Sequence, residues 1–347
     1  MKKNKVRKYL VPIIVFLFLV WGFFWPMSNY IEGPGDAADL SQIVNIKNHP
    51  DRQKGQFMLT SVGIAQAHPF TYAWAKVNPY YSIVSADSVT GGQNVSEYDK
   101  VQNFYMESSI NEAIYAAYKK AGKQVKRTYN GIYVLAITNN SKFRGKLKVG
   151  DVVVKIDGHH FSNANGFVNY VKGKKLGQTL SVEFKRNGHL HTVSAPLVKI
   201  ANNRAGIGIT LADDMQVKPE IPINVNPGDV GGPSGGLMFS LQIYSQLINQ
   251  NLRHGKKVAG TGMIDSQGDV GEIGGIDKKV IAAKRKGATV FLAPYIKPTK
   301  LILKYEEDHE TNYELAKKTA KKYAPNMKVI PVTSFSQAIS KLQKLND

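Results

Sequence analysis

The chain has 347 residues, with 46 Lys and Arg against 26 Asp and Glu, a formal net charge of +20 and no cysteine. This length allows two or three domains. Hydrophobic residues make up 43% and charged residues 21%, which excludes a disordered chain and a polytopic membrane protein. The lack of cysteine excludes disulfides, thiol nucleophiles and cysteine-ligated metal sites. The positive excess is compatible with nucleic acid, anionic lipid or anionic wall polymer as a neighbour.

The first thirty residues predict a membrane anchor. Positions 2–8 hold five Lys or Arg, and positions 9–28 hold no charged residue. A helix over 9–27 would be about 28 Å long, which is close to the thickness of a bilayer core. No small-residue cleavage site follows the apolar run, which favours an uncleaved anchor over a signal peptide.

The charge beside this segment predicts its topology. The positive-inside tendency places residues 1–8 in the cytoplasm and the rest of the chain outside the cell. The outer part would carry a net charge of +15. Lipid or wall polymer would be its anionic neighbour, unless the basic surface is merely solvated, and no nucleic acid is expected as a partner there.

The next two regions predict a stalk and an α/β region. Residues 29–55 contain Gly, Pro and Asp and are typical of a stalk. Alternation over 56–65 predicts a strand, and apolar spacing over 96–120 predicts a helix. We expect the whole of 56–124 to pack on the module that follows.

Residues 125–200 predict a small β-rich module. Residues 147–158 indicate a turn, an alternating strand and an Asp-Gly hairpin turn, and two further strands flank a turn at 186–188. Here the sequence matches L-x-x-G-D-x-[IV]-x-x-[IV]-x-G and resembles a PDZ domain. The resemblance implies that an extended peptide adds as a strand to an open sheet edge. It leaves open whether the module binds C-terminal or internal peptide segments, or whether its role is purely structural. The implied peptide-binding residues are Gly131, Ile132, Tyr133 and Val134.

Ser234 stands where a Gly- and Pro-rich turn over 227–233 enters a helix that runs to Ile248. Free backbone N–H groups at a helix N-terminus can stabilise an oxyanion, so this serine is a candidate nucleophile. Capping the helix is the alternative role for a serine in this place.

Two other nucleophile patterns overlap the same turn. Gly232–Gly236 satisfies the G-x-S-x-G pattern of α/β-hydrolases, but that fold needs a downstream histidine, and only His254 and His309 follow. Such an esterase stays open as an alternative, and it predicts that loss of one of these histidines abolishes activity. Gly228–Pro233 resembles the signature of chymotrypsin-type proteases, but Val230 occupies the nucleophile position, so we reject this interpretation.

A lysine can replace histidine as the base that activates a serine. Lys279 shares a helix face with Ile276 and Ala283, so its stem can point into the protein. Lys278 falls on a more polar side with Arg285. Burial can lower a lysine pKa from about 10.4 to near neutrality, where the amine becomes an effective base.

Both segments together resemble the Lon-family peptidase domain. That family carries G-P-S-[AG]-G at its nucleophile and, further along, [IL]-G-G-[ILV]-x-x-K-x-x-A-A at its catalytic lysine. This chain has Gly232–Gly236 and Ile273–Ala283 in that order, with the serine and the lysine 45 residues apart. The resemblance implies an α/β (α+β) Lon-type peptidase domain over 201–347.

The resemblance also implies roles for single residues. Ser234 is implied as the nucleophile, Lys279 as the general base, and Thr261 as a hydrogen-bonding neighbour of that lysine. Gly231 stands where the family has Asp, and Met263 where it has Glu, so the charges around the dyad must differ from those in Lon. The further candidates for supporting the nucleophile or completing the oxyanion hole are Gly232, Pro233 and Gly235.

The sequence has no G-x-x-x-x-G-K-[ST] segment, so we expect no ATP requirement. We also expect no cofactor and no metal. The domain order resembles the membrane-anchored PDZ-Lon peptidases of Gram-positive bacteria. It implies a single-pass extracellular serine endopeptidase that makes limited cuts in secreted peptides or small membrane proteins, with the PDZ domain assisting. The alternative is an inactive adaptor at the cell surface, and the oligomeric state is open.

The predicted organisation places a PDZ domain and an α/β peptidase domain behind one transmembrane helix. The predicted segments are a cytoplasmic basic flank (1–8), a transmembrane anchor (9–28), a stalk (29–55), an α/β region (56–124), a PDZ domain (125–200) and a Lon-like proteolytic domain (201–347).

Overall fold

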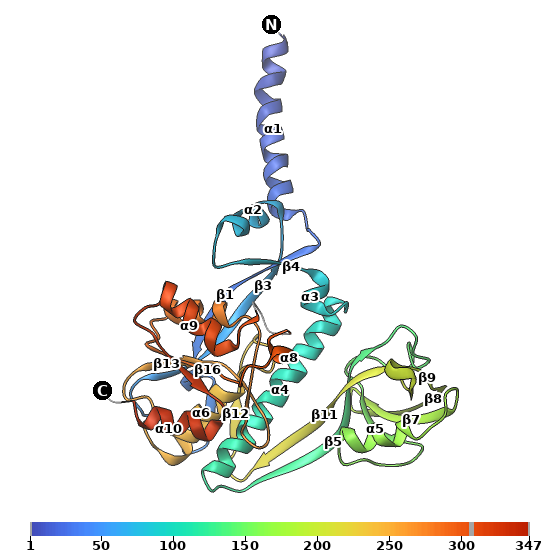
Figure 1. Cartoon of the computed structure of the whole chain (residues 1–347). Helices are drawn as coiled ribbons and strands as arrows, with labels where there is room; N and C mark the ends of the chain where they lie inside the picture. Colours follow the sequence, from blue (N-terminus) through green and yellow to red (C-terminus); the bar gives the residue numbers. More distant parts are fainter. Residues whose placement is uncertain (1, 305–308, 346–347) are drawn as a thin grey trace.

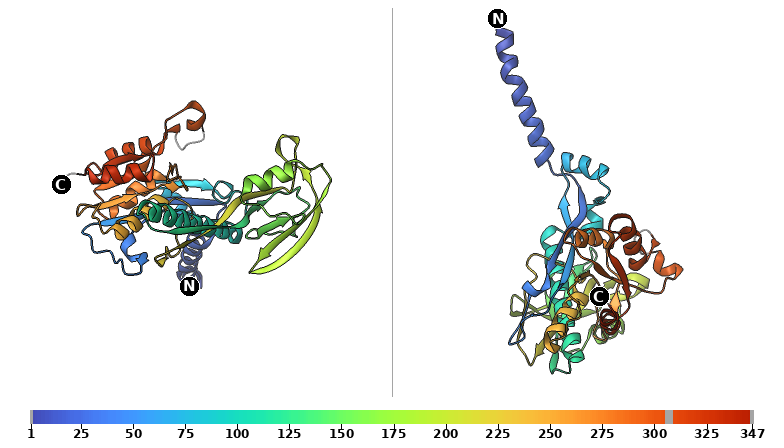
Figure 2. Two further views of the ribbon diagram at one scale, coloured as in Figure 1. Left: turned by 90° about the horizontal axis from the view of Figure 1, so that it is seen from below. Right: turned by 90° about the vertical axis from the view of Figure 1, so that its left-hand side faces the viewer.

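A computed structural model describes residues 2–304 and 309–345, with the backbone alone at 2–8 and at Asn202. It consists of a projecting N-terminal helix, a large lobe and a small lobe (Figure 1). The small lobe, residues 129–211, lies to one side of the large lobe and is joined to it by a long two-stranded ribbon (Figure 2).

The N-terminal helix α1 (Lys2–Phe24) corrects the predicted membrane topology. It ends three residues before the expected end at Met27, and its uncharged part begins only at Tyr9. That part rises about 24 Å, which is short of a bilayer core of about 30 Å. No helix within 2–304 and 309–345 is long and apolar enough to cross a membrane. The predicted transmembrane anchor over 9–28 is therefore wrong, as is the single-pass, extracellular localisation built on it.

A six-stranded mixed sheet forms the centre of the large lobe, in the order β17-β16-β13-β3-β1-β4. Strand β3 pairs with β1 in the antiparallel sense and with β13 in the parallel sense. Residues 29–66, which the sequence predicts as a stalk and a separate region, thus supply central strands of this sheet. The strands are β1 (Asn29–Asp39), β3 (Gln56–Gln66), β4 (Ser82–Ser85), β13 (Lys257–Gly260), β16 (Val290–Pro294) and β17 (Lys328–Val332).

Helices cover both faces of this sheet because its strands bury alternate side chains on opposite faces. In β3, Phe57 and Leu59 join one core cluster, and Met58 joins another. Helices α4 (Val95–Lys120), α6 (Gly236–Ile248) and α10 (Phe335–Gln343) supply the first cluster. Helices α7 (Ile276–Arg285) and α9 (Asn312–Tyr323) supply the second cluster. The mixed α/β class predicted for the peptidase domain is confirmed.

Shorter elements complete the large lobe. They are η1 (Leu40–Gln42), β2 (Val44–Ile46), α2 (Pro69–Val77), α3 (Ala86–Thr90), β12 (Ile223–Val225), β14 (Met263–Ile264), β15 (Val270–Gly271) and α8 (Lys300–Leu303).

The small lobe is a five-stranded antiparallel sheet, in the order β11-β5-β6-β7-β8, packed on helix α5. Its β7–β8 hairpin turns at Asn187-Gly188, both of which have positive φ as a two-residue I′ turn requires. The strand and turn predicted over 147–158 are also present. Its elements are β5 (Val125–Ile137), β6 (Val152–Ile156), α5 (Ala164–Lys172), β7 (Thr179–Arg186), β8 (His189–Pro196), β9 (Val198–Lys199), η2 (Ala201–Asn203), β10 (Ala205–Gly206) and β11 (Ile209–Pro219).

Two features connect the lobes. Strands β5 and β11 pair from one lobe to the other, so Val125 and Val217 pack on the large core while Ile137 and Ile209 pack on the small one. Helix α4 also contacts both lobes, and the ring of its Phe104 stacks on Tyr133 of β5 with centroids 3.9 Å apart.

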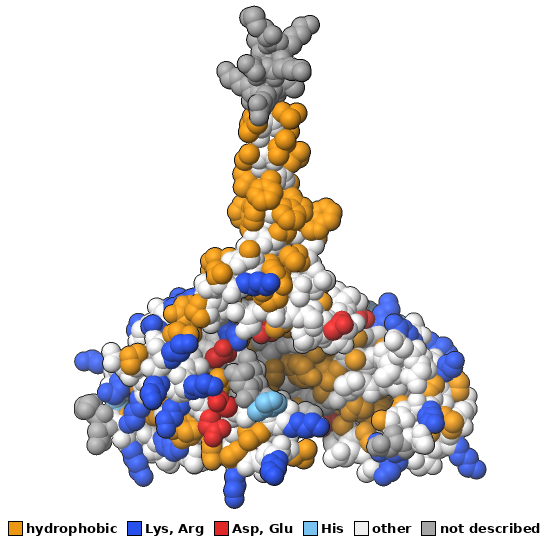
Figure 3. All heavy atoms as spheres, turned by 45° about the horizontal axis from the view of Figure 1, so that its top comes forward, with side chains coloured by type: hydrophobic (Ala, Val, Ile, Leu, Met, Phe, Trp, Pro, Cys, Tyr) orange, Lys and Arg blue, Asp and Glu red, His pale blue; other side chains and the backbone are white. Residues whose placement is uncertain are grey.

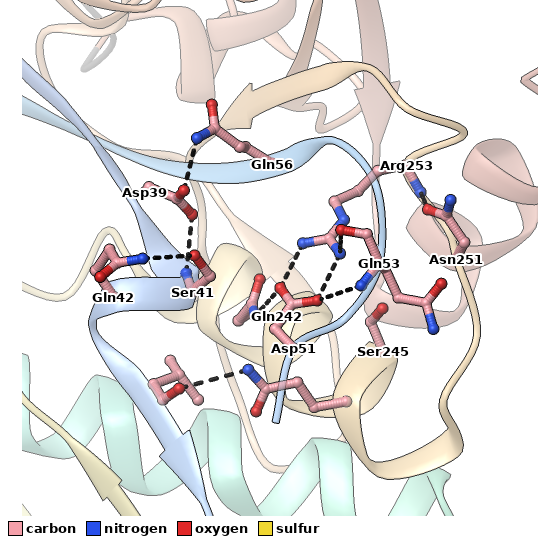
Figure 4. Close-up of polar contacts among 12 residues, drawn as sticks. Asp39, Ser41, Gln42, Asp51, Gln53, Gln56, Gln242, Ser245, Asn251 and Arg253 are labelled. Carbon is pink, nitrogen blue, oxygen red and sulfur yellow. Dashed lines mark hydrogen bonds and ion pairs between the residues drawn. The ribbon is translucent and has the colours of Figure 1, made fainter. Parts of the chain in front are cut away.

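A buried polar network ties the loop before β3 to the middle of α6 and to the segment that follows this helix (Figure 4). The guanidinium of Arg253 donates two hydrogen bonds to the carboxylate of Asp51, at 2.6 and 2.7 Å, and Gln242 donates a third at 2.8 Å. The side chains of Arg253 and Asp51 are only 1% and 6% exposed. The buried ion pair therefore fixes the segment after α6, and Gln242 ties the middle of the helix to it.

Candidate active site

Ser234 lies in the loop between β12 and α6, two residues before the first residue of that helix. This loop packs directly on α4, because the Gly232 N–H donates to the Gln102 carbonyl at 2.9 Å and the Ser109 hydroxyl donates to the Pro233 carbonyl at 2.9 Å. A Cβ at position 231 would lie 2.8 Å from the Cβ of Gln102, so only glycine allows this approach. The loop that carries Ser234 is thus held in place by a helix that is distant in sequence.

Lys279 comes from α7, on the opposite face of the sheet from α4 and α6. Its side chain is 3% exposed, and its Nζ lies 2.6 Å from Ser234 Oγ and 3.0 Å from Thr261 Oγ1. Burial lowers the pKa of Lys279 from 10.5 to about 7, because an apolar environment penalises the ammonium form. Lys278, predicted on a polar side of the helix, is 4% exposed and pairs with Asp277 at 2.9 Å.

Thr261 follows β13 and links the two candidate catalytic residues. Its hydroxyl is fully buried and donates to the Ser234 carbonyl at 3.0 Å. Its oxygen is therefore left to accept the hydrogen bond from Lys279 Nζ. The Gly262 N–H donates to the same Ser234 carbonyl at 2.9 Å. Thr261 thereby orients both the lysine and the serine.

Ser234 and Lys279 open into a cavity of about 880 Å³. The face seen in Figure 3 is hollowed below the N-terminal helix, between the two lobes. On the β13 side, no described strand pairs with β3 beyond Leu59, so the edge from Thr60 to Ile64 borders the cavity unpaired. The other lining residues come from α4 (Tyr98, Asp99, Gln102, Asn103 and Met106), from the loop over 229–235, and from Met263 and the segment over 272–274.

The backbone N–H groups of the loop decide which residues can bind an oxyanion. Within the described part of the chain, the N–H of Ser234 donates to no acceptor, and neither does that of Gly235, the residue that caps α6. The N–H of Gly232 is occupied by Gln102, and Pro233 has no N–H. Of the predicted candidates, Gly235 is thus available as a donor, whereas Gly232 and Pro233 secure the loop.

The residues predicted to bind peptide in the small lobe lie inside its sheet. Ile132 pairs with Asp213 on one side and Val153 on the other, and Tyr133 is likewise flanked by two strands. No strand can add there, so the structure does not place Gly131–Val134 at an open edge. A groove of about 290 Å³ lies elsewhere in this lobe, between α5 and the segment over 204–209.

This groove and the contribution of α4 were not predicted from the sequence. Gly206-Ile207-Gly208-Ile209 was assigned to the peptidase domain, but this segment lines the groove of the small lobe. The helix over 96–120 was predicted, but Ser109 lies 124 residues before Pro233 and nothing local in sequence marks their contact. Neither His254 nor His309 lines the cavity that holds Ser234.

A family model described as "PDZ domain" matches residues 119–197. The Lon protease of Porphyromonas gingivalis is 32% identical over 97 residues, which cover 28% of this chain and 11% of that protein. The Lon protease of Endomicrobium trichonymphae is 25% identical over 178 residues, which cover 47% of this chain and 20% of that protein. The chain contains a PDZ domain and is related to Lon proteases.

These matches are partial. The matched region spans between a tenth and a fifth of the length of these two Lon proteases. Among solved structures, the PDZ domain of an SdrC-like protein from Listeria monocytogenes is 30% identical and covers 24% of this chain and 90% of that one, with a TM-score of 0.24. Because the family model matches residues 119–197, the small lobe is called the PDZ lobe below.

Proposed function

We propose that this chain is an ATP-independent serine endopeptidase in which Ser234 is the nucleophile and Lys279 the general base. The observation that carries the proposal is the 2.6 Å contact between Ser234 Oγ and the Nζ of a buried lysine. A lysine with a pKa of about 7 is half deprotonated at neutral pH and can accept the serine proton. The relation to Lon proteases supports the same activity.

The proposed reaction follows from the positions of these groups. Neutral Lys279 takes the proton from Ser234 Oγ while this oxygen attacks the peptide carbonyl carbon. The resulting oxyanion accepts hydrogen bonds from the free N–H groups of Ser234 and Gly235. The Lys279 ammonium then gives this proton to the leaving amine as the C–N bond breaks, which leaves an acyl-enzyme on Ser234. Neutral Lys279 next takes a proton from water as the water oxygen attacks the acyl carbon, and the ammonium returns that proton to Ser234 Oγ as the ester bond breaks.

The substrate class in this proposal is a peptide or a small protein with an exposed segment. The sequence has no Walker A segment, so the chain would not unfold substrates with ATP. The unpaired edge of β3 beside Ser234 suits an extended peptide, because such an edge offers free backbone groups. We propose that the PDZ lobe assists substrate engagement.

The test is cleavage of a peptide library by the full chain, with the cuts mapped by mass spectrometry. We expect defined cuts by the wild type, and at least a 1000-fold loss of rate in Ser234→Ala and in Lys279→Ala, about the size seen when a catalytic nucleophile or base is removed. Lys284→Ala, which removes an exposed lysine from the same helix, is the matched control and should keep its activity. Equal cleavage by Ser234→Ala and wild type would refute the proposal, and no cleavage by any form would leave the inactive adaptor as the better account.

A further inference from the structure

The Ser109 hydroxyl makes a contact that the proposed reaction does not use. Ser109 lies on α4, is 4% exposed, and donates its hydroxyl proton to the carbonyl oxygen of Pro233 at 2.9 Å. Pro233 immediately precedes the candidate nucleophile. The Ser109 oxygen also lies 3.1 Å from where a Cβ of Gly236 would stand, so α4 and the start of α6 approach closely at this point.

The geometry of the peptide unit connects this hydrogen bond to the proposed oxyanion site. The carbonyl of Pro233 and the N–H of Ser234 belong to one peptide group, which is planar and trans. Fixing the direction of the carbonyl therefore fixes the direction of the N–H, which points the opposite way. Ser109 occupies the carbonyl, and within the described residues the Ser234 N–H keeps no acceptor, so it stays available to a substrate oxygen.

Because residue 233 is proline, the orientation of the Pro233–Ser234 peptide group depends on the hydrogen bond from Ser109. Pro233 has no N–H, so the segment between Gly232 and Ser234 cannot be held by a backbone donor at that residue. The N–H of Gly232 donates a hydrogen bond to the carbonyl of Gln102, which precedes Ser109 on the same helix α4. Two points of attachment on one rigid helix thus flank the residue before the nucleophile.

We propose that Ser109 is a positioning residue that orients the Ser234 N–H toward the developing oxyanion of the scissile carbonyl. This inference rests on the proposed peptidase function. Ser109 acts only through the Pro233–Ser234 peptide group and touches neither substrate nor Lys279. Its removal therefore weakens stabilisation of the transition state more than binding of the substrate.

The test compares Ser109→Ala with Ser240→Ala in the full chain, on a peptide that the wild type cleaves. Ser240 is a matched control because it is also a buried serine with a hydroxyl that donates to a backbone carbonyl. Its acceptor is the Gly236 carbonyl, at 2.8 Å within α6, and not the peptide group that contains the Ser234 N–H. We expect Ser109→Ala to lower kcat about 10- to 100-fold, which is a smaller loss than that caused by removing a direct oxyanion donor. KM should change less than about twofold. Ser240→Ala should keep kcat within about twofold.

Three further readouts separate positioning from a general structural effect. Affinity for a peptide aldehyde, which forms a tetrahedral adduct, should fall in Ser109→Ala by about the same factor as kcat. The midpoint of the pH–rate profile should stay where it is in the wild type, because Lys279 is untouched. Ser109→Thr, which keeps the hydroxyl, should recover most of the lost rate.

The outcomes distinguish this inference from the proposed function. Wild-type cleavage that disappears in Ser234→Ala but is unchanged in Ser109→Ala would overturn the positioning role alone. Equal losses of kcat in Ser109→Ala and Ser240→Ala, or a rise in KM at constant kcat, would also overturn it. Cleavage that survives Ser234→Ala would overturn the proposed function and the role of Ser109 with it.

Discussion

Lys279 is forced toward its neutral form by the same packing that builds the domain. Its helix face also carries Ile276, Val280 and Ala283, all buried against the sheet. The ammonium has lost its water, and the only side-chain oxygens within hydrogen-bond distance in the described structure are the hydroxyls of Ser234 and Thr261. Two neutral hydroxyls compensate a buried charge only weakly, so the pKa of the amine falls.

Thr261→Val tests how much this environment depends on one hydroxyl. The change keeps the shape but removes the hydrogen bond accepted from Lys279 and the one donated to the Ser234 carbonyl. We expect kcat to fall about 10-fold or more, because a loss of this size corresponds to the net free energy of about two hydrogen bonds. The pH–rate midpoint should move to lower pH, because loss of an acceptor destabilises the ammonium form and lowers the pKa of Lys279.

Kinetics from pH 5 to 9 would measure both effects of Thr261→Val. Thr319→Val changes a buried threonine on α9, outside the cavity, and should leave the profile unaltered. A midpoint that moves to higher pH would show that Thr261 does not stabilise the charged lysine.

At the scale of elements, α6 is fixed in its first turn and at its middle by groups that other segments supply. The Leu237 N–H in its first turn donates to the Gly262 carbonyl at 3.1 Å. Gln242 from the middle of the helix and Arg253 from the segment after it converge on Asp51 (Figure 4). The position of Ser234 therefore depends on contacts well beyond the cavity that it lines.

Asp51→Asn should destabilise the protein by about 3–5 kcal/mol, because it leaves the buried Arg253 guanidinium without a counter-charge. The double variant Asp51→Leu/Arg253→Met removes both charges and should lose less. Urea unfolding measures both free energies. A single variant that is no less stable than the double would contradict this account of the pair.

The pH dependence of this pair has a defined sign. Burial alone would raise the pKa of Asp51, but hydrogen bonds from Arg253 and Gln242 outweigh it, so the pKa lies below its ordinary value. A carboxyl with a lowered pKa contributes stability that is fully present above its unfolded value of about 3.9. We therefore expect this contribution to be lost only as the pH falls through the lowered value in the folded state.

The elements also show what the sequence could predict. Local patterns predicted the helix over 96–120, the hairpin at 186–188 and the strand over 152–156, because spacing and turn residues are local signals. The contact between Ser234 and Lys279 was predicted only through the resemblance to Lon. The sheet order could not be predicted, because β3 pairs with a strand about two hundred residues later in the chain.

At the scale of the whole molecule, the PDZ lobe is attached by more than a linker. Helix α4 carries Ser109 and Gln102, which bind the loop that contains Ser234. The same helix carries Phe104, which stacks on Tyr133 of the PDZ lobe. Strand β11, which lies beyond the predicted boundary at residue 200, pairs with β5 of the PDZ lobe and packs on the large core at Val217.

A double-mutant cycle tests whether this stacked pair joins the lobes. Phe104→Leu and Tyr133→Leu each remove one ring, and the coupling energy from the four unfolding free energies should be about 1 kcal/mol, as for other stacked aromatic pairs. The matched pair Phe104→Leu with Phe184→Leu, whose second ring lies in the core of the PDZ lobe, should be additive. Additivity of the first pair would show that the contact does not couple the lobes.

The central claim is that Lys279 is a base that works at neutral pH. The pH dependence of kcat/KM tests it most directly, because this quantity reports the ionisation of the free enzyme. Since only the neutral amine can accept the Ser234 proton, activity should rise with pH and reach half its maximum near the lysine pKa of about 7. A profile that is flat from pH 5 to 9, or one whose midpoint lies near the ordinary lysine pKa of about 10.4, would contradict the account.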